Sequence, residues 1–344
     1  MVKHSSRFTP HRFLITGGCG FIGTNLIRKL TNEGDHQIRI LDNLSVGTRE
    51  DLAGLGAFVE SEASSALDRS DSPDVLHLMV GDIRDPEACR AATQNADVIV
   101  HLAANTGVGP SVEDPKGDME ANVAGAVNML EAARENGVQR FVFASSGAPV
   151  GEVEPPIHEE LAPHPVSPYG ASKLAGEGYC SAYRNTFGLE TVALRFGNVY
   201  GPGSSHKSSV VAKFIRQALE GKTCEIYGDG SQTRDFIYID DLTEAILKAV
   251  RFTSSSGPLP WGQVFQIATS QEHTVLEVAE RLGKLLKDRG IALNLTHGAP
   301  RLGDVRRNYS DTTRAREVLH WQAQTNLDQG LEKTVGWFLN QGTL

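Results

Sequence analysis

Phe13-Leu-Ile-Thr-Gly-Gly-Cys-Gly-Phe-Ile-Gly23 is the stretch that decides the fold. An apolar run leads into three glycines, Gly17, Gly20 and Gly23, each three residues apart, and a helical pattern follows. In a strand–turn–helix unit the first glycine permits the tight turn, the second lets a pyrophosphate approach the backbone, and the third allows helix and strand to pack closely. The free N–H groups at the start of the helix then bind the phosphates. The stretch therefore predicts a dinucleotide-binding turn.

An acidic residue, Asp42, ends the second apolar run, nineteen residues after Gly23. At the end of a strand such a carboxylate accepts hydrogen bonds from both hydroxyls of the adenosine ribose, and it repels a 2′-phosphate. The alternative is that Asp42 only caps a turn with Asn43. The order of strand, glycines, helix, strand and aspartate weighs against that alternative and favours NAD over NADP.

Short apolar runs alternate with helical patterns through the first half of the chain. We expect strands at residues 13–16, 38–41, 77–80, 98–101 and 141–144, and helices at residues 23–33, 86–95 and 121–136. Such alternation implies βαβ units and a parallel sheet that helices cover on both faces. The predicted fold class is α/β, a doubly wound parallel sheet of the Rossmann type with a smaller C-terminal α/β domain.

The regular alternation is interrupted in two places. Residues 60–74 (ESEASSALDRSDSPD) are rich in Ser and Asp and predict a mobile surface insertion. After Tyr200, turns such as Gly-Pro-Gly and Asp-Gly-Ser separate short segments, which indicates a second domain. We expect the NAD-binding domain to span 1–196 together with 235–252, and the substrate domain to span 197–234 and 253–344.

The composition excludes several classes of protein. The 344 residues carry a formal net charge of −9, whereas a general nucleic-acid binder needs a basic face. The polar start MVKHSSRFTPHR does not resemble a signal peptide, and no window of 18 apolar residues predicts a membrane span. The cysteines form no CxxC pair and indicate neither a zinc site nor disulfides; they are Cys19, Cys89, Cys180 and Cys224. We expect a soluble cytoplasmic protein without a metal.

Tyr169-Gly-Ala-Ser-Lys173 places a phenol and an amine on one face of a helix. A free tyrosine is a poor base at neutral pH, and a nearby ammonium stabilises the phenolate and lowers the pKa of the phenol. Ser146 follows the strand expected at 141–144, where its hydroxyl would bridge a substrate oxygen and the phenol. Alternatively, Ser146 makes a cap or loop hydrogen bond, and the Tyr/Lys pair is an exposed helical pair. Together the three residues predict a proton-transfer site.

Eight motifs, in order, resemble the NAD-dependent epimerase/dehydratase family of the extended short-chain dehydrogenase/reductase class, over nearly the whole chain. They are TGGCGFIG (16–23), LDN (41–43), GDIRD (81–85), HLAAN (101–105), SSGAPVG (145–151), PYGASK (168–173), RFGNVYGPG (195–203) and YGDGSQTRDFIYIDD (227–241). The most similar type is the UDP-sugar 4-epimerases. The resemblance implies an isomerase of nucleotide-sugar metabolism with NAD as cofactor, which oxidises its UDP-sugar transiently to a 4-keto sugar.

The resemblance also implies roles for single residues. The catalytic residues would be Ser146, Tyr169 and Lys173, and Lys173 would also bind the nicotinamide ribose. The cofactor would be bound by Gly17, Gly20, Phe21, Ile22, Gly23, Asp42, Asn43, Asp82, Ile83, Ala103, Ala104 and Asn122. The nucleotide sugar would contact Ser146, Asn198, Val211, Arg234, Arg301 and Asp304. Arginine suits bidentate phosphate binding, although a surface ion pair is the alternative for either arginine.

The two positions after Ser146 separate the activities of the family. The 4,6-dehydratases have an Asp-Glu pair there and the UDP-glucuronate decarboxylases a Glu at the second position, whereas this chain has Gly147 and Ala148. Without a carboxyl group, water elimination has no obvious acid. We therefore expect a UDP-hexose 4-epimerase acting on the glucose/galactose, N-acetyl or uronic acid forms. A dehydratase, a ketoreductase and a non-catalytic NAD-binding regulator are the alternatives.

Several segments depart from the usual family pattern or are less specific. Gly109-Pro110, Pro149-Val150 and Gly197 stand where bulkier residues are common, which leaves the sugar open. Residues 152–165 predict a covering loop. His206 and Lys207 are interpreted as loop residues, with a charged sugar as the alternative contact. Members of the family usually dimerise through two long helices, one of which carries Tyr169, so we expect a homodimer.

Overall fold

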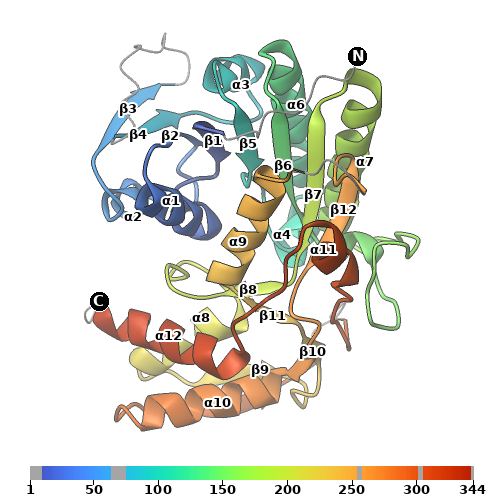
Figure 1. Ribbon diagram of the computed structural model, residues 1–344. Helices are drawn as coiled ribbons and strands as arrows, with labels where there is room; N and C mark the ends of the chain where they lie inside the picture. The colour runs from blue at the N-terminus through green and yellow to red at the C-terminus, as the bar shows by residue number, and fades with distance from the viewer. Residues whose placement is uncertain (1–9, 63–74, 254–257, 301–304, 342–344) are drawn as a thin grey trace.

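The computed structural model describes residues 10–62, 75–253, 258–300 and 305–341. An eight-stranded parallel sheet, in the order β12-β7-β6-β5-β1-β2-β4-β3, forms its centre (Figure 1). The strands are β1 (Arg12–Thr16), β2 (Gln37–Asp42), β3 (Phe58–Glu62), β4 (Leu76–Val80), β5 (Val98–His101), β6 (Arg140–Ser146), β7 (Glu190–Phe196) and β12 (Gln263–Ile267). The predicted doubly wound parallel α/β sheet is confirmed.

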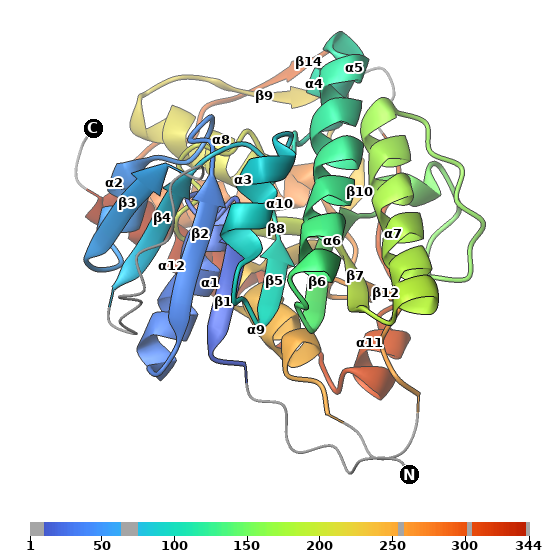
Figure 2. The same ribbon diagram turned by 90° about the horizontal axis from the view of Figure 1, so that it is seen from above.

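Helices cover both faces of the sheet and enclose two cores. α3 (Pro86–Thr93), α6 (Gly125–Glu135) and α7 (Pro168–Phe187) lie on one face, and α1 (Phe21–Glu33) and α9 (Ile239–Val250) lie on the other (Figures 1 and 2). Side chains alternate between these cores along each strand. On β1, Phe13 and Ile15 join the core beneath α1 and α9, and Leu14 joins the core beneath α3, α6 and α7. Burial on both faces explains the continuous apolar runs of the inner strands.

The edge strand β3 corrects one prediction. The composition places residues 60–62 in a surface insertion, yet Phe58–Glu62 pairs in parallel with β4. Because β3 is an edge strand, its side chains are only partly covered, and Val59 is 54% exposed. It therefore lacks the buried apolar run by which the inner strands are predicted. The remainder of the expected insertion, 63–74, lies outside the described residues.

The helical segment expected at 121–136 is longer and less regular than predicted. It follows α4 (Val108–Glu113) and consists of α5 (Pro115–Met119), a π-helical turn (Glu120–Ala124) and α6. A π-turn inside a helix often marks a functional site. The expected helices at 23–33 and 86–95 correspond to α1 and α3, and two shorter elements, α2 (Arg49–Ala53) and a 3₁₀ turn (Ala148–Val150), complete this part.

Below the sheet, α8 (Val210–Leu219), α10 (Val275–Lys287) and α12 (Leu327–Asn340) pack together (Figure 1). Three short strand pairs accompany them: β8 (Asn198–Tyr200) with β11 (Phe236–Tyr238), β9 (Cys224–Tyr227) with β14 (Leu295–Gly298), and β10 (Thr233–Arg234) with β13 (His273–Thr274). The helix α11 (Thr313–Val318) contacts β12. β12 falls within 253–344, the range expected to belong to the substrate domain, yet it is part of the large sheet. The division into two domains stays a prediction, and β12 must be counted with the NAD-binding domain.

A buried ion pair fastens α7 to the sheet. Glu177 on α7 accepts hydrogen bonds from Nε and Nη2 of Arg195 on β7, at 2.8 and 2.7 Å, and from Ser145 Oγ on β6, at 2.6 Å. Both charged side chains are only 4% exposed. Because Glu177 and Arg195 are each other's directly bonded counter-charge, the loss of one partner would leave the other charge buried without it.

Glu177→Ala should therefore lower the free energy of unfolding by about 3–5 kcal/mol, because it strands the Arg195 guanidinium in the interior. Arg90→Ala, which removes an exposed Arg–Glu pair on α3, is the control and should change stability little. Urea unfolding followed by circular dichroism measures both. Equal stability of the two variants would contradict the role given to the buried pair.

Candidate functional site

The glycine turn after β1 has the geometry of a dinucleotide cradle. Gly17 has a φ of +67°, its N–H donates to the Leu41 carbonyl at 2.9 Å, and a Cβ there would lie 2.8 Å from Ala103 N. A Cβ at Gly23 would lie 2.5 Å from Gly18 Cα. Both positions therefore need glycine, because the neighbouring atoms belong to the backbone.

The first turn of α1 is open to an anion. Gly20 precedes the helix with no side chain capping it, and the helix begins with the partly buried Phe21 and Ile22. A helix start without a side-chain cap leaves its first N–H groups for another acceptor, and the helix dipole favours a negative charge. The turn and the helix start thus fit a bound diphosphate, as the glycine pattern predicts.

Asp42 ends β2 beside the glycine turn. Its carboxylate accepts hydrogen bonds from the backbone N–H groups of Cys19 and Leu44, each at 2.9 Å. Burial raises the pKa of Asp42 above its usual value, and these two bonds oppose the shift. A carboxylate has about four acceptor positions, so acceptors remain for ribose hydroxyls. Asp42 therefore caps the turn, which was the alternative role considered for it, and its remaining acceptor positions also fit the predicted contact with the adenosine ribose.

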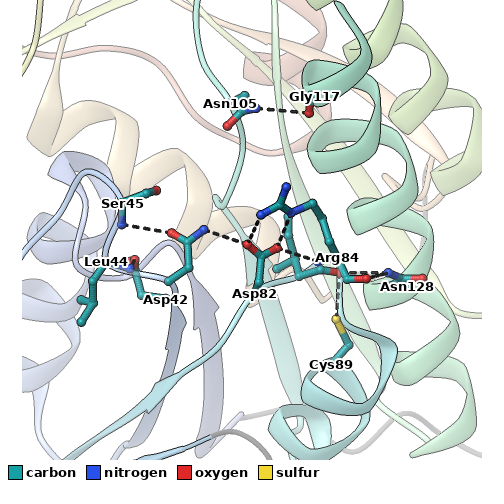
Figure 3. Close-up of polar contacts among 11 residues, drawn as sticks. Asp42, Leu44, Ser45, Asp82, Arg84, Cys89, Asn105, Gly117 and Asn128 are labelled. Carbon is teal, nitrogen blue, oxygen red and sulfur yellow. Dashed lines mark hydrogen bonds and ion pairs between the residues drawn. The ribbon is translucent and has the colours of Figure 1, made fainter. Parts of the chain in front are cut away.

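A second carboxylate lies at the adjacent strand end. Asn43 Nδ2 donates to Asp82 Oδ2 at 3.0 Å, and the Arg84 guanidinium beside Asp82 lowers the pKa of that carboxyl to about 2 (Figure 3). The next residue, Ile83, is buried against α6, where a Cβ on Gly125 would lie 2.7 Å from its side chain. The structure therefore brings the predicted Asn43, Asp82 and Ile83 together beside the glycine turn.

Asn122, in the π-turn, fixes the loop that follows β5. Its Oδ1 accepts from the Asn105 N–H at 2.8 Å, and its Nδ2 donates to the Asn105 carbonyl at 2.9 Å. Upstream in the same loop, the Ala103 N–H donates to Thr16 Oγ1 at 3.1 Å, and Ala104 is partly buried. Asn122 is itself only 2% exposed, so it acts on the predicted cofactor loop by holding its backbone.

Ser146, Tyr169 and Lys173 lie together where β6 meets α7. The Lys173 ammonium donates to the Ala144 carbonyl at 2.9 Å and lies 5.8 Å from the centre of the Tyr169 ring. Ser146 lies close enough to Tyr169 to lower the pKa of its phenol. Ser146 Oγ also accepts from the Ala148 N–H at 3.2 Å, so the loop contact that was the alternative for Ser146 is present as well. Their catalytic roles stay predictions.

The protonation of this group differs from the expectation. The sequence predicts a lowered pKa for Tyr169, but burial, together with the charge of Asp118, raises the pKa of its phenol to about 12, against the opposing hydrogen bond from Ser146. Burial also lowers the pKa of Lys173 to about 8, although Asp118 and Glu177 oppose this shift. The prediction was wrong because it counted the neighbouring ammonium and omitted the cost of desolvating the phenolate.

Buried polar residues that the sequence analysis missed support α7, the helix that carries Tyr169 and Lys173. Asp118 Oδ1 accepts from Asn122 Nδ2 at 2.9 Å and its Oδ2 accepts from Ser172 Oγ at 2.6 Å, so one carboxylate joins the π-turn to α7. Asp118 is only 2% exposed. An isolated Asp and Ser in helical segments carry no signal of this kind, because most such residues face solvent.

His101 illustrates a different kind of buried group. Its Nδ1 lies 2.8 Å from Thr16 Oγ1, and its ring packs against Phe141 and Phe143. Burial, with a smaller contribution from the charge of Lys173, lowers the pKa of His101 to about 3. The imidazole is therefore neutral throughout the physiological range, and it acts as a packed strand residue.

The residues predicted to bind the substrate differ in exposure, and two of them lie outside the described residues. Asn198 is exposed on β8, and Arg234 on β10 donates from Nη1 to the carbonyls of Thr233 and Val305, at 2.6 and 2.7 Å. Val211 is buried in the core beneath α8. Arg301 and Asp304 lie outside the described residues.

Another buried carboxylate, Asp235, which the sequence analysis missed, accepts hydrogen bonds from Thr269, Ser270 and Ser310.

Space is available beside Ser146, at the position where the resemblance implies an acid in dehydratases. A Cβ built on Gly147 would have a single neighbour within 4 Å, Asn308 Nδ2 at 3.9 Å. Packing therefore does not require glycine at position 147. Residues 307–311 also hold the expected covering loop, since the Ile157 N–H donates to the Tyr309 carbonyl at 2.8 Å.

The described part of the chain contains neither a metal cluster nor a membrane helix. Across residues 10–62, 75–253, 258–300 and 305–341, no group of three or more His, Cys, Asp or Glu side chains is arranged to hold a metal ion. No helix within the same ranges combines the length and the apolarity needed to cross a membrane.

Comparison with known proteins agrees with this geometry. The profile of the NAD dependent epimerase/dehydratase family matches residues 13–268. UDP-glucose 4-epimerase of Mycolicibacterium smegmatis is 37% identical, over 96% of this chain and 99% of its own length. Similarity also extends, at 28% identity over 96% of this chain and 93% of that protein, to dTDP-glucose 4,6-dehydratase 1 of Escherichia coli. Sequence similarity alone therefore does not separate epimerases from dehydratases.

Two solved structures show the same fold with ligands. UDP-glucose 4-epimerase of Thermus thermophilus, in complex with NAD, has a TM-score of 0.81 and 33% identity over 95% of this chain and 99% of that one. UDP-glucose 4-epimerase of Thermotoga maritima, with UDP-glucose, has a TM-score of 0.82 and 32% identity over 96% of this chain and 99% of that one.

The buried Lys173 makes a testable contribution to the pH dependence of stability. Its pKa falls from 10.5 to about 8 on folding, so between these values the unfolded chain binds more protons than the folded one. Stability should therefore rise with pH across this window. Relative to Lys173→Met, which lacks the titration, the wild-type free energy of unfolding should increase by roughly 2 kcal/mol between pH 7 and pH 9.5.

Urea unfolding of both proteins at several pH values measures this difference. Because every other titrating group is common to the two proteins, the difference isolates Lys173. A gap between the two proteins that stays constant with pH would show that Lys173 keeps its ordinary pKa in the folded chain.

Proposed function

This chain belongs to the NAD-dependent epimerase/dehydratase family, and from that premise we propose that it is a UDP-hexose 4-epimerase. The observation that carries the proposal is the set of groups around Ser146. A phenol, an amine and a hydroxyl converge there, while Gly147 and Ala148 supply no carboxyl group. The set supports removal and return of a hydroxyl proton but gives water elimination no acid beside Ser146.

The proposed mechanism assigns one task to each of these residues. Tyr169 Oη accepts the proton of the sugar hydroxyl as its carbon is oxidised, and it returns that proton when the carbon is reduced from the other face. Ser146 Oγ orients the sugar oxygen toward the phenol. Lys173 places its ammonium beside the Tyr169 ring and stabilises the phenolate. Bound NAD supplies the hydride acceptor and, when oxidised, a positive charge that offsets the burial of the phenolate.

The alternatives account for fewer of the observations. A 4,6-dehydratase needs a carboxyl group for elimination, and Asp118 is unsuited because both of its oxygens already accept hydrogen bonds from Asn122 and Ser172. A ketoreductase would consume added NADH in stoichiometric amounts. A non-catalytic NAD-binding regulator has no use for Ser146, Tyr169 and Lys173 in one place.

The second part of the chain supplies the proposed nucleotide-sugar site. We propose that residues 197–234 and the C-terminal region outside β12 bind the UDP-sugar, with Asn198 and Arg234 directed to its phosphates and Arg301 and Asp304 completing the set. Asn198 on β8 and Arg234 on β10 lie in two short strand pairs outside the large sheet, and both adjoin the buried Asp235, whose carbonyl accepts from the Asn198 N–H at 2.8 Å. We expect the choice of sugar to depend on the space next to Gly147, where Asn308 is the neighbouring side chain.

Replacing Tyr169 by phenylalanine tests the proposed chemistry. Tyr169→Phe should reduce epimerisation by at least about 10²-fold, because it removes the proton acceptor, and should leave NAD binding unchanged. Products from a panel of UDP-, dTDP-, CDP- and GDP-sugars are separated by their anomeric NMR signals, and bound NAD is measured in the same samples. No addition of NAD(H) should be needed for turnover by the holoenzyme.

Three outcomes would contradict the proposal. Full activity of Tyr169→Phe would remove the phenol from the mechanism. Loss of a water molecule from the sugar would show a dehydratase, and stoichiometric consumption of added NADH would show a ketoreductase. A wild-type protein that binds NAD but produces no epimer from any UDP-sugar would overturn the assignment as a 4-epimerase.

We also propose a homodimer formed through the face that carries α7. Large apolar side chains are exposed on neighbouring elements there, among them Val112 on α4, Met119 on α5 and Tyr179 on α7, and α6 lies beside α7 (Figure 2). Exposed apolar side chains that gather on one face support an interface rather than a free surface.

Tyr179→Arg should convert the dimer to a monomer, because it places an additional charge in the proposed interface. Leu219→Arg is the matched control, since Leu219 is 40% exposed on α8, against 42% for Tyr179 on α7. Light scattering coupled to size-exclusion chromatography measures the mass of each variant. A dimer that survives Tyr179→Arg, or that is lost with Leu219→Arg, would place the interface elsewhere.

A further inference from the structure

The loop that follows β8 lies directly against the first turn of α1. Asn25 Nδ2, on α1, donates to the Pro202 carbonyl at 2.9 Å and to the Phe21 carbonyl at 2.8 Å. Gly203 has a φ of +86°, and a Cβ there would lie 3.1 Å from the same Asn25 nitrogen. This close approach therefore favours glycine at position 203. As a result, a segment from the second part of the chain lies next to the glycine turn that follows β1.

Lys207 extends from this loop toward α1. Its Nζ lies 5.5 Å from the centre of the Phe21 ring, within the range of a cation–π contact. Its backbone is fixed at both ends, since its N–H donates to the Ser204 carbonyl at 3.0 Å and its carbonyl accepts from Arg216 Nη1 at 2.7 Å. The ammonium therefore has a defined position beside the first residue of the helix.

This ammonium has no partner of opposite charge among the carboxylates that the structure describes. The nearby Asp51 lies 3.7 Å from the neighbouring His206 instead. Lys207 is half-buried, and burial lowers its pKa without an opposing contribution from any acid. A desolvated ammonium that lacks a counter-charge is unfavourable, so its position is best accounted for by an anion that binds beside it.

We propose that Lys207 binds the diphosphate of NAD from the side opposite the glycine turn. The uncapped start of α1 offers N–H groups to this anion, and Lys207 adds a full positive charge over the same helix turn. The inference rests on the NAD site proposed above and extends it with a residue from the substrate-binding part of the chain. Lys207 is thus a ligand of the cofactor, whereas the sequence predicts a loop residue, with a charged sugar as its alternative contact.

The UDP-sugar also carries a diphosphate, so NAD and the UDP-sugar both offer Lys207 an anion of the same kind. Lys207 touches Phe21, which opens the cofactor helix, whereas the residues proposed for the sugar nucleotide, Asn198 and Arg234, lie on β8 and β10. Contact with Phe21 favours the cofactor. Binding measurements with each diphosphate separately distinguish the two.

Lys207→Met tests the assignment, and Lys213→Met is its matched control. Lys213 lies on α8, is also half-buried, and holds its Nζ at the same 5.5 Å from an aromatic ring, that of Tyr227. Titration calorimetry on full-length protein freed of NAD compares four probes: NAD, ADP-ribose, adenosine and UDP. Lys207→Met should weaken NAD and ADP-ribose by about tenfold, because it removes a charge-assisted contact, and should leave adenosine and UDP unchanged.

The control and the conservative variant complete the test. Lys213→Met should bind all four probes like the wild type, and Lys207→Arg should retain most of the affinity for NAD, because it keeps the charge. Unchanged binding of NAD by Lys207→Met would overturn the proposal, as would a loss confined to UDP. Because no arm measures turnover, a failure of the 4-epimerase assignment would leave this result interpretable.

Discussion

The close approach of backbone segments at the carboxyl ends of β1, β2 and β5 is the constraint on which the rest of the site depends. Gly17 donates to the Leu41 carbonyl, the Cys19 N–H donates to Asp42, and the Ala103 N–H donates to Thr16. A side chain at Gly17 would meet the backbone of Ala103, so the three strand ends can meet only around a glycine. Because neighbouring parallel strands end at the same edge of the sheet, the residues predicted to bind the cofactor lie together there.

A series of buried and partly buried hydrogen bonds connects this region to α7, which carries Tyr169 and Lys173. It runs from the backbone of Asn105 through Asn122 and Asp118 to Ser172, which is the residue before Lys173. On the other side of α7, Glu177 binds Arg195 and Ser145. Hydrogen bonds therefore hold α7 on two sides. Tyr169 and Lys173 project from a helix that is fixed by the paired side chains of Ser172 and Glu177. Such support is what a proton-transfer site requires, since small displacements weaken catalysis.

The sequence predicts the fold and the cofactor turn because both follow from local patterns. Apolar runs identify the inner strands, and the spacing of Gly17, Gly20 and Gly23 between a strand and a helix is typical of a dinucleotide-binding turn. Edge strand β3 escapes prediction because its exposed face carries no apolar run. Asp118 and Ser172 escape it because their pairing joins helices that are far apart in sequence. The direction of the Tyr169 pKa shift was wrong for a related reason, since burial depends on the tertiary structure.

The hydrophobic core beneath α1 and α9 continues without interruption into the helices below the sheet. Leu26 on α1, Ile246 on α9, Phe214 on α8, Leu282 on α10 and Leu331 on α12 all belong to this one core. Because these side chains are buried together, we expect the helices below the sheet and the sheet itself to unfold cooperatively. A ligand that binds the glycine turn should therefore also raise the melting temperature of the helices below the sheet. The cofactor is in this sense a structural component of the whole chain.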